Sequence, residues 1–232
     1  MNEDHRAADP DILRVTRTKR EAKSFYDRVS GIYDWLTRAF ERRFAEKALE
    51  RLDARDGEVV LEIGFGSGHC LRAIARAVGR KGSAHGVDIS RGMLVVARKK
   101  LAESGLAEKA HPLLGDAARL PYKDSVFDAV FMSYTLELFD TAEIPCVLDE
   151  IRRVLRPRGR VGVASLSREG GGSPMLRLYE WAHERWPKYA DCRPIYVERS
   201  LRDAGFGIRS KDVVRWFGLP NEIVVAANPA PV

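Results

Sequence analysis

Residues 59–70 read VVLEIGFGSGHC, a short apolar run followed by an acid and then by three glycines at every second position. The apolar run predicts a buried strand, and the glycines predict a tight turn that leads into a helix. Such a turn presents bare backbone N–H groups and the positive end of a helix to a ligand. This stretch therefore indicates an α/β fold that binds a nucleotide-like molecule at the end of its first strand.

Apolar runs and helical patterns alternate downstream of this stretch, which is typical of a parallel sheet covered by helices. Further strands are expected at residues 83–88, 111–114, 127–133 and 160–165, and helices at 70–78, 144–155 and from a Ser90 cap to about 103. The second of these helices should stop at Arg-Pro-Arg-Gly, residues 156–159. The last two strands, 207–216 and 222–227, follow a short helix at 196–204 and are joined by the turn 218–221, so they must form an antiparallel hairpin. The pattern predicts a Rossmann-like, mostly parallel sheet with an antiparallel edge.

The chain divides into three predicted parts. Residues 1–20 are polar and expected to be flexible, residues 21–57 carry apolar side chains at helical spacing and predict a helical cap, and residues 58–232 form one domain. Within that domain, residues 166–193 begin with a glycine-rich turn and continue into an aromatic-rich helix. We interpret this segment as a lid-like insertion over the substrate.

Composition limits the function classes. A chain of 232 residues with 45% hydrophobic content can bury a full core. Its charge of +6 is spread along the sequence without a dense basic tract, so a dedicated nucleic-acid site is not expected. Three scattered cysteines, without a paired motif or a histidine cluster, indicate a reduced protein without a metal. No secretory signal or long apolar window is present, and we expect a cytoplasmic protein with peripheral membrane contact as a further possibility.

The glycine spacing excludes the common phosphate loops. The dinucleotide fingerprint would need glycine at position 69, where this chain has His69, and the P-loop pattern is absent. Glu62 precedes the first glycine by two residues. A carboxylate there would repel a pyrophosphate but would attract an ammonium group.

Two further acids predict the remaining parts of the ligand. Asp88 ends the second strand, where a carboxylate can accept hydrogen bonds from both ribose hydroxyls, and Asp116 follows the third strand, where it could bind an exocyclic amino group. Singly, each acid also fits a helix-end, cap or turn role. Together they describe a ligand with an amine, a ribose and an amino-base but little phosphate. S-adenosylmethionine fits that description.

The ordered segments LEIGFGSG, HGVDIS, GDAARLPYKDSVFDAVFMS and LDEIRRVLRPRGRVGVA resemble the class I S-adenosylmethionine-dependent methyltransferase family over residues 57–166. The resemblance implies a seven-stranded sheet whose last strand is antiparallel. It also implies roles for the residues that match. Glu62 would bind the amino group of the cofactor, and the methionine moiety would lie against Gly64, Gly66, Gly68 and Ser133. Asp88 would bind the ribose, and the adenine would contact Ile89, Asp116 and Ala117.

The segment FYDRVSGIYDWLTRAFERRF resembles the start of the UbiE/COQ5-like group within methyltransferase type 11. That group methylates a ring carbon of quinol precursors, and related enzymes act on phospholipid head groups. The resemblance places Tyr33 over cofactor and substrate, with Tyr26 in a second copy of the same Tyr-Asp pair. The group's continuation after this pair is replaced by YDWLTRAFERRF, and its Arg-Asn after strand four is replaced by TLELFD. We therefore predict methyl transfer to a small or lipophilic acceptor, quinone-precursor-like or a lipid head group.

Catalytic and substrate residues are predicted from position alone. Candidate bases are His69, Tyr134, Glu137 and His183, and Tyr33 is a further catalytic candidate, although positioning alone can supply much of the rate of methyl transfer. The aromatic side chains predicted to line the acceptor site are Tyr26, Tyr33, Tyr179 and Trp186.

Residues 36–52 place Leu36, Phe40, Phe44, Ala48 and Leu52 on one helical face, with arginines and a lysine elsewhere around the helix. This pattern suits an anionic bilayer surface, and it equally suits a helix that caps the sheet.

Two other functions remain open at this stage. A non-catalytic cofactor-binding scaffold would keep the same acids. An RNA methyltransferase would explain the basic pI of about 9.3, but the Asn/Asp-Pro-Pro-aromatic motif that accompanies methylation of amino groups is missing after residue 133.

Overall fold

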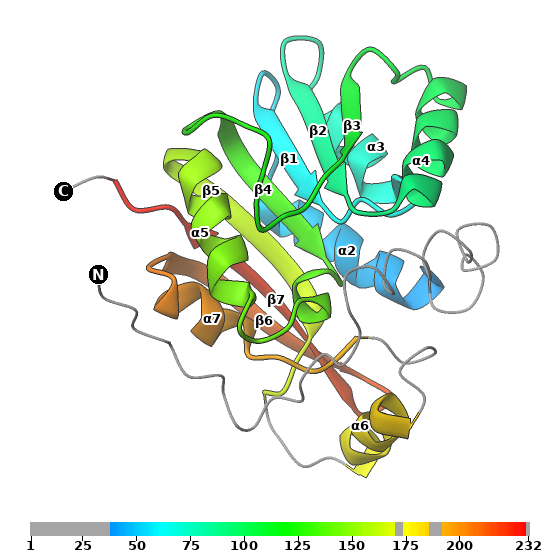
Figure 1. Cartoon of the computed structure of the whole chain (residues 1–232), viewed down its shortest axis with the longest axis vertical. Helices are drawn as coiled ribbons and strands as arrows, with labels where there is room; N and C mark the ends of the chain where they lie inside the picture. Colours follow the sequence, from blue (N-terminus) through cyan, green and yellow to red (C-terminus); the bar gives the residue numbers. More distant parts are fainter. Residues whose placement is uncertain (1–37, 170–173, 186–191, 231–232) are drawn as a thin grey trace.

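The structure is a computed structural model that describes residues 38–169, 174–185 and 192–230 (Figure 1). Seven strands form one sheet in the order β3-β2-β1-β4-β5-β7-β6. Their bounds are β1 Val59–Ile63, β2 Ser83–Asp88, β3 Ala110–Leu114, β4 Phe127–Ser133, β5 Leu155–Leu166, β6 Gly207–Trp216 and β7 Leu219–Ala227. Strands β1 to β5 are parallel, and β7 runs antiparallel to both β5 and β6. The predicted Rossmann-like fold class is confirmed.

Helices cover both faces of this sheet and bury two apolar layers. One layer is shared by α2 (Arg38–Leu52), α3 (His69–Ala77) and α4 (Arg91–Glu103), and the opposite one by α5 (Ile144–Val154) and α7 (Val197–Asp203). The helix α6 (Pro174–Arg185) lies near the tip of the β6–β7 hairpin, and a short 3₁₀ turn, η1 (Leu136–Leu138), follows β4 (Figure 1). In the described ranges, no helix combines the length and the apolar character that spanning a membrane requires.

The predicted start of α4 is confirmed in detail. Ser90 has extended backbone angles, and its hydroxyl accepts a hydrogen bond from the Met93 N–H at 3.2 Å. A serine in this position satisfies one of the N–H groups that have no partner inside the helix. The cap fixes the direction in which α4 leaves Asp88.

The helix α2 turns its apolar face to the sheet. Phe44, Ala48 and Leu52 are buried, and the helix packs on β4, β5 and β7. The bilayer interpretation of this face is therefore wrong, because these side chains already fill the core. Leu36 and the side chain of Phe40 lie outside what the structure describes.

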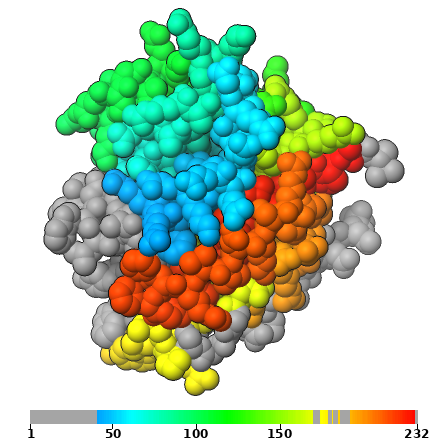
Figure 2. Space-filling model, turned by 180° about the vertical axis from the view of Figure 1, so that it is seen from behind, coloured from blue at the N-terminus to red at the C-terminus, as the bar shows by residue number. Residues whose placement is uncertain are grey.

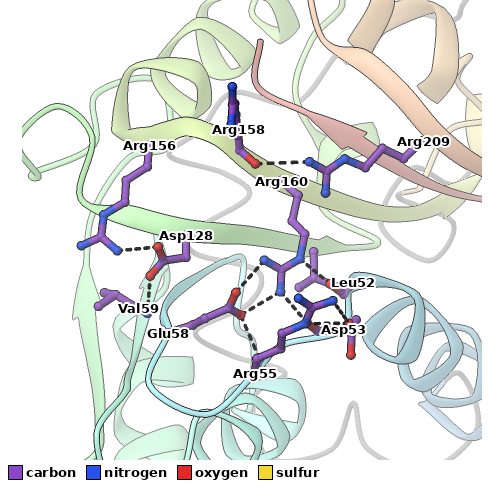
Figure 3. Close-up of polar contacts among 10 residues, drawn as sticks. All are labelled: Leu52, Asp53, Arg55, Glu58, Val59, Asp128, Arg156, Arg158, Arg160 and Arg209. Carbon is purple, nitrogen blue, oxygen red and sulfur yellow. Dashed lines mark hydrogen bonds and ion pairs between the residues drawn. The ribbon is translucent and has the colours of Figure 1, made fainter. Parts of the chain in front are cut away.

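Arginine side chains form hydrogen bonds and ion pairs at the edge of the sheet where β1 begins and α2 ends (Figure 3). Arg160 on β5 donates to the carbonyl oxygens of Leu52 and Asp53, both at 2.5 Å, and to the two carboxylate oxygens of Glu58 at 2.8 and 2.7 Å. The last carbonyls of a helix lack partners within it, and a cation is favourable there. Arg160 thus ties the end of α2 to the sheet.

Residues 155–159 are part of the strand β5, whereas the sequence predicted a helix as far as Leu155 and a helix stop at residues 156–159. The helix α5 ends at Val154 and β5 begins at once, with a register shift where it pairs with β4. Arg158 adopts a φ of 66°, and its N–H donates to the carbonyl of Asn228 at 3.0 Å. The prediction failed because proline and glycine marked a helix stop, whereas long-range pairing on both sides keeps this segment extended.

The β6–β7 hairpin is confirmed, but its turn is shorter than predicted. Trp216 pairs with Leu219, which leaves only Phe217 and Gly218 between the strands. Both have positive φ angles, 45° and 80°, as a two-residue turn of the hairpin type requires. The strand β7 consequently starts at Leu219.

Candidate functional site

The predicted cofactor residues meet at the carboxyl edge of the parallel strands. The last residues of β1, β2 and β4 and the loops after β1, β2 and β3 carry them, and β1 and β4 are neighbours although they are not consecutive. Chain connections therefore leave in opposite directions from this pair of strands. In open α/β sheets, ligands bind outside the carboxyl ends at such a switch point.

The glycine loop makes a tight turn over this edge. Gly64, Gly66 and Gly68 have φ angles of 74°, 49° and 79°, which side-chain-bearing residues rarely adopt. A Cβ atom on Gly64 would lie 2.3 Å from Oγ1 of Thr135, whereas a Cβ on Gly66 would meet nothing within 4 Å. The loop is thus packed on one side and leaves open space at Gly66, where a ligand can approach the backbone.

Asp88 joins this loop to the next one. Its Oδ2 atom accepts from the Gly66 N–H and its Oδ1 atom from the Ser90 N–H, both at 2.8 Å. An ionised carboxylate has about four acceptor sites, so both oxygens keep capacity for hydroxyl donors. The side chain is half-buried beside the glycine loop, as a ribose ligand would require.

Glu62 is buried beneath the loop, with only 3% of its surface exposed. Its Oε2 atom has no hydrogen-bond partner among the described residues. Burial, and then the charge of Asp88, raises the pKa of Glu62 well above its usual range. An unpaired buried carboxyl oxygen is costly, and a cationic amino group placed against it would remove that cost. The residues present therefore fit the methionine end of S-adenosylmethionine.

The remaining predicted cofactor residues lie along the same edge. Asp116 accepts from the Ala118 N–H at 3.0 Å, Ala117 is buried, and Ile89 is half-buried after β2. Ser133 is half-buried at the end of β4, and its carbonyl accepts from the Thr135 hydroxyl at 2.9 Å. Thr135 was not predicted as a site residue. Its contact with Gly64 depends on β4 lying next to β1, which no local pattern reveals.

Two of the candidate bases have structural partners. The Tyr134 hydroxyl donates to Oδ1 of Asn221 at 2.7 Å, and burial raises the pKa of Tyr134 far above its ordinary value. It therefore connects β4 to β7 and does not suit the role of a base. His69 lies 3.1 Å from the Glu46 carboxylate, which joins α3 to α2, and burial lowers its pKa.

Several predicted substrate residues fall outside the described part of the chain. Tyr26, Tyr33 and Trp186 belong to segments that the structure does not describe. Tyr179 and His183 lie in α6, but their side chains are likewise not described. Their roles stay predictions.

One acidic cluster resembles a metal site in composition. Glu169, Glu198 and Glu222 converge, but Lys211 Nζ lies 3.0, 2.7 and 3.5 Å from their carboxylate oxygens. Burial opposes the charge of Lys211, yet its hydrogen bonds to Glu198 and Glu169 and the charge of Glu222 hold its pKa above the ordinary value. The ammonium group already supplies the cation of this cluster, so its role is structural.

The comparisons with known proteins agree with this geometry. Residues 60–159 match the family model described as a methyltransferase domain. The chain is 31% identical over 169 residues to the 2-phytyl-1,4-naphtoquinone methyltransferase of Synechococcus elongatus, covering 71% of each chain. It is 29% identical to the demethylmenaquinone methyltransferase of Lactobacillus johnsonii, covering 90% of this chain and 89% of that one. It is 35% identical to the nocamycin O-methyltransferase of Saccharothrix syringae, covering 68% of this chain and 53% of that one.

Solved structures share the fold. The [4+2]-cyclase SpnF has a TM-score of 0.73 at 22% identity, covering 93% of this chain and 98% of that one. A SAM-dependent methyltransferase from Aquifex aeolicus has a TM-score of 0.60 at 24% identity, covering 91% and 98%. The chain belongs to the class I S-adenosylmethionine-dependent methyltransferase family. It is a methyltransferase with S-adenosylmethionine as its cofactor, and the scaffold and RNA alternatives are not favoured.

Proposed function

We propose that this methyltransferase acts on a lipophilic small molecule, either an aromatic quinone precursor or a lipid head group. The names of the relatives support this choice, because one is a 2-phytyl-1,4-naphtoquinone methyltransferase, another a demethylmenaquinone methyltransferase and a third an O-methyltransferase. The observation that carries the cofactor half of the proposal is the buried Oε2 atom of Glu62, which lacks a partner in the described residues.

Each residue of the cofactor set has a proposed role. Glu62 binds the amino group, the glycine loop lies along the methionine moiety, and Asp88 accepts from the ribose hydroxyls. Ile89, Asp116 and Ala117 hold the adenine. Ser133 ends β4 beside the loop, so the methyl group would be presented there. This arrangement aligns donor and acceptor, and positioning supplies much of the rate in such reactions.

The acceptor would be covered by two further parts of the chain. We propose that the predicted cap, residues 21–57, and the insertion, residues 166–193, line its site, with Tyr26, Tyr33, Tyr179 and Trp186 as apolar contacts. The described part of the insertion supports this place, because Met175 at the start of α6 lies against the hairpin turn at Gly218. That turn lies at the carboxyl edge, since Asn221 on β7 pairs with Leu166 at the end of β5.

A labelled-methyl assay tests the proposal. Purified protein and S-adenosylmethionine with a labelled methyl group are incubated with reduced 2-phytyl-1,4-naphthoquinone and, separately, with fractionated cell extract. We expect label in the quinol or in the lipid fraction. Asp88→Ala is the internal test of the site, and it should weaken S-adenosylmethionine binding by ~1–3 kcal/mol in calorimetry through lost charged hydrogen bonds. Label that enters only RNA or protein would contradict the proposed acceptor, and an unchanged affinity would remove Asp88 from the ribose role.

We also propose that the enzyme contacts a membrane, through a surface other than α2. Most exposed large apolar side chains among the described residues gather on α6 and the end of β6: Met175, Leu178, Trp181, Val213, Trp216 and Phe217. Phe217, at the hairpin tip, is 79% exposed. Figure 2 shows α6 beside this hairpin on the face that α2 crosses.

Basic side chains accompany this apolar surface. The Arg43 guanidinium lies 5.9 Å from the centre of the Trp216 ring, and Arg177, Arg185 and Arg215 are exposed nearby in the sequence. Aromatic and aliphatic groups flanked by arginines favour the interface of an anionic bilayer. A lipophilic acceptor could then pass from the bilayer to the adjacent carboxyl edge of the sheet.

Vesicle binding tests this contact. The protein should sediment with phosphatidylcholine vesicles that contain anionic phosphatidylglycerol and much less with phosphatidylcholine alone. The double change Trp216→Ser and Phe217→Ser should lower the partition coefficient about tenfold or more, because burying each large side chain contributes about 1.5–3 kcal/mol. Val95→Ser removes an exposed apolar side chain from α4, away from this surface, and should change nothing. Equal binding by the double variant and the wild type would contradict the proposal.

A further inference from the structure

A second buried carboxyl oxygen, in addition to that of Glu62, has no hydrogen-bond partner in the described residues. It is Oε2 of Glu137, a residue with no exposed surface in the turn η1 after β4. Leaving such a group unpaired is unfavourable, because burial removes its hydrogen bonds to water and nothing replaces them. The amino group of the cofactor would pair with the Oε2 atom of Glu62, but no part of the cofactor is proposed to pair with Glu137.

Glu137 lies in the turn after β4, four residues beyond Ser133, where the methyl group would be presented. Its Oε1 atom accepts from the Leu166 N–H, at 3.3 Å, at the end of β5. Two residues earlier, Thr135 lies against Gly64 of the cofactor loop. The nucleoside-binding loops follow β2 and β3 on the far side of β1. The Glu137 carboxyl is therefore on the side of the switch point where an acceptor, and not the adenosine, would lie.

The surroundings of this carboxyl suit proton transfer. Burial raises the pKa of Glu137 to about 8, although hydrogen bonds from its own N–H, the Leu166 N–H and the Ser165 hydroxyl lower it, and the charge of Glu41 on α2 raises it further. The charge of Glu137 in turn helps to raise the pKa of the Tyr134 phenol. A base is most effective when its pKa lies near the working pH, and a phenol ordinarily titrates near 10.

We propose that Glu137 is a catalytic residue that receives a hydroxyl group of an aromatic acceptor and takes its proton. The inference rests on the proposed function and deepens it by specifying an acceptor with an ionisable ring hydroxyl. The O–H bond breaks and the proton passes to Oε2 of Glu137. The electron pair left on oxygen, or on a conjugated ring carbon, forms the bond to the methyl carbon. The carbon–sulfur bond breaks with its pair going to sulfur, which releases S-adenosylhomocysteine. A ring carbon that is methylated then loses its own proton to solvent, and Glu137 returns its proton to the ring oxygen, which restores the aromatic hydroxyl.

Kinetics with reduced 2-phytyl-1,4-naphthoquinone form the first arm of the test. The wild-type kcat should rise with pH and level off above about 8, because the base must be deprotonated. Glu137→Gln keeps a hydrogen bond to the hydroxyl but cannot take the proton, so kcat should fall about 100- to 10,000-fold with KM within about twofold. In this variant the levelling off above about pH 8 should be lost and kcat should keep rising toward about pH 10, where the phenol itself ionises, and Glu137→Asp should restore part of the rate. The control Glu103→Gln, at an exposed position of α4, should behave as the wild type.

Binding without turnover forms the second arm. With S-adenosylhomocysteine bound, calorimetry compares the quinol with its dimethyl ether, which has no hydroxyl proton. The wild type should prefer the quinol about tenfold, and Glu137→Leu should have no preference. Calorimetry with S-adenosylmethionine alone should give equal affinities for all the Glu137 variants and so exclude misfolding.

The two arms separate this inference from the proposed function. No transfer to the quinol by the wild type would contradict the proposed acceptor, and the binding preference would then decide the role of Glu137. Wild-type turnover and pH dependence in Glu137→Gln would overturn the inference. A wild type without preference for the quinol over its ether would overturn it as well.

Discussion

Gly64→Ala is expected to lower the free energy of unfolding by about 3 kcal/mol. The new Cβ would lie 2.3 Å from Oγ1 and 2.4 Å from Cγ2 of Thr135, far inside contact distance. Overpacking of this kind costs about 1–3 kcal/mol, and a positive φ of 74° adds about 1 kcal/mol for a residue with a side chain. Urea unfolding measures the loss.

The neighbouring glycine provides the matched control. Gly66 also has a positive φ, of 49°, but a Cβ there would meet nothing within 4 Å. Gly66→Ala should therefore lose only about 1 kcal/mol, the backbone part of the effect. Combining Gly64→Ala with Thr135→Ala removes the two nearest clashing atoms and should recover at least about 1 kcal/mol. Equal losses at the two glycines would show that Thr135 does not press on the loop.

Glu222→Ala is expected to destabilise the fold by about 4 kcal/mol. The fully buried carboxylate accepts from the Ser167 hydroxyl at 2.9 Å and from the Val197 and Glu198 N–H groups at 3.2 and 3.1 Å. A strand residue thus caps the start of α7, and Lys211 lies 3.5 Å away. Removing one partner of a buried charged network costs about 3–5 kcal/mol.

An exposed pair gives the comparison for this change. Glu103 on α4 lies 4.0 Å from Lys99, with both side chains largely in water. Glu103→Ala should change the unfolding free energy by less than about 0.5 kcal/mol in the same urea titration. If Glu222→Ala were equally mild, the cluster around Lys211 would not contribute to the stability of this end of the sheet.

The fold could be predicted from the sequence because its signals are local. The strand, glycine turn and helix at residues 59–77 and the Ser90 cap depend on neighbouring residues, and the structure has them where the pattern indicated. The errors came from distant contacts. The apolar face of α2 looked compatible with a bilayer until β4, β5 and β7 were found beneath it. Residues 156–159 were predicted as a helix stop and not as part of a strand, because their pairing partners lie in other parts of the chain.

The candidate site likewise contains residues that local patterns predicted and residues that depend on distant contacts. Glu62, the three glycines, Asp88 and Asp116 follow strand ends, so the order of strands predicted that they would share an edge. Thr135, Asn221 and Ser165 could not be predicted, because each acts on a residue brought near by the sheet. Glu137 could be named as a candidate base from its position after strand four. Its burial and its unpaired oxygen depend on β5, which the local sequence does not reveal.

The position of β7 between β5 and β6 has a consequence for the order of folding. This strand is synthesised after the six other strands of the sheet, yet it supplies Asn221 to Tyr134 and Glu222 to the start of α7. The cofactor loops on β1 and β2 need no partner from it. During synthesis the cofactor half of the enzyme can therefore assemble early, while the loop that carries Glu137 stays without its support until the final strand inserts.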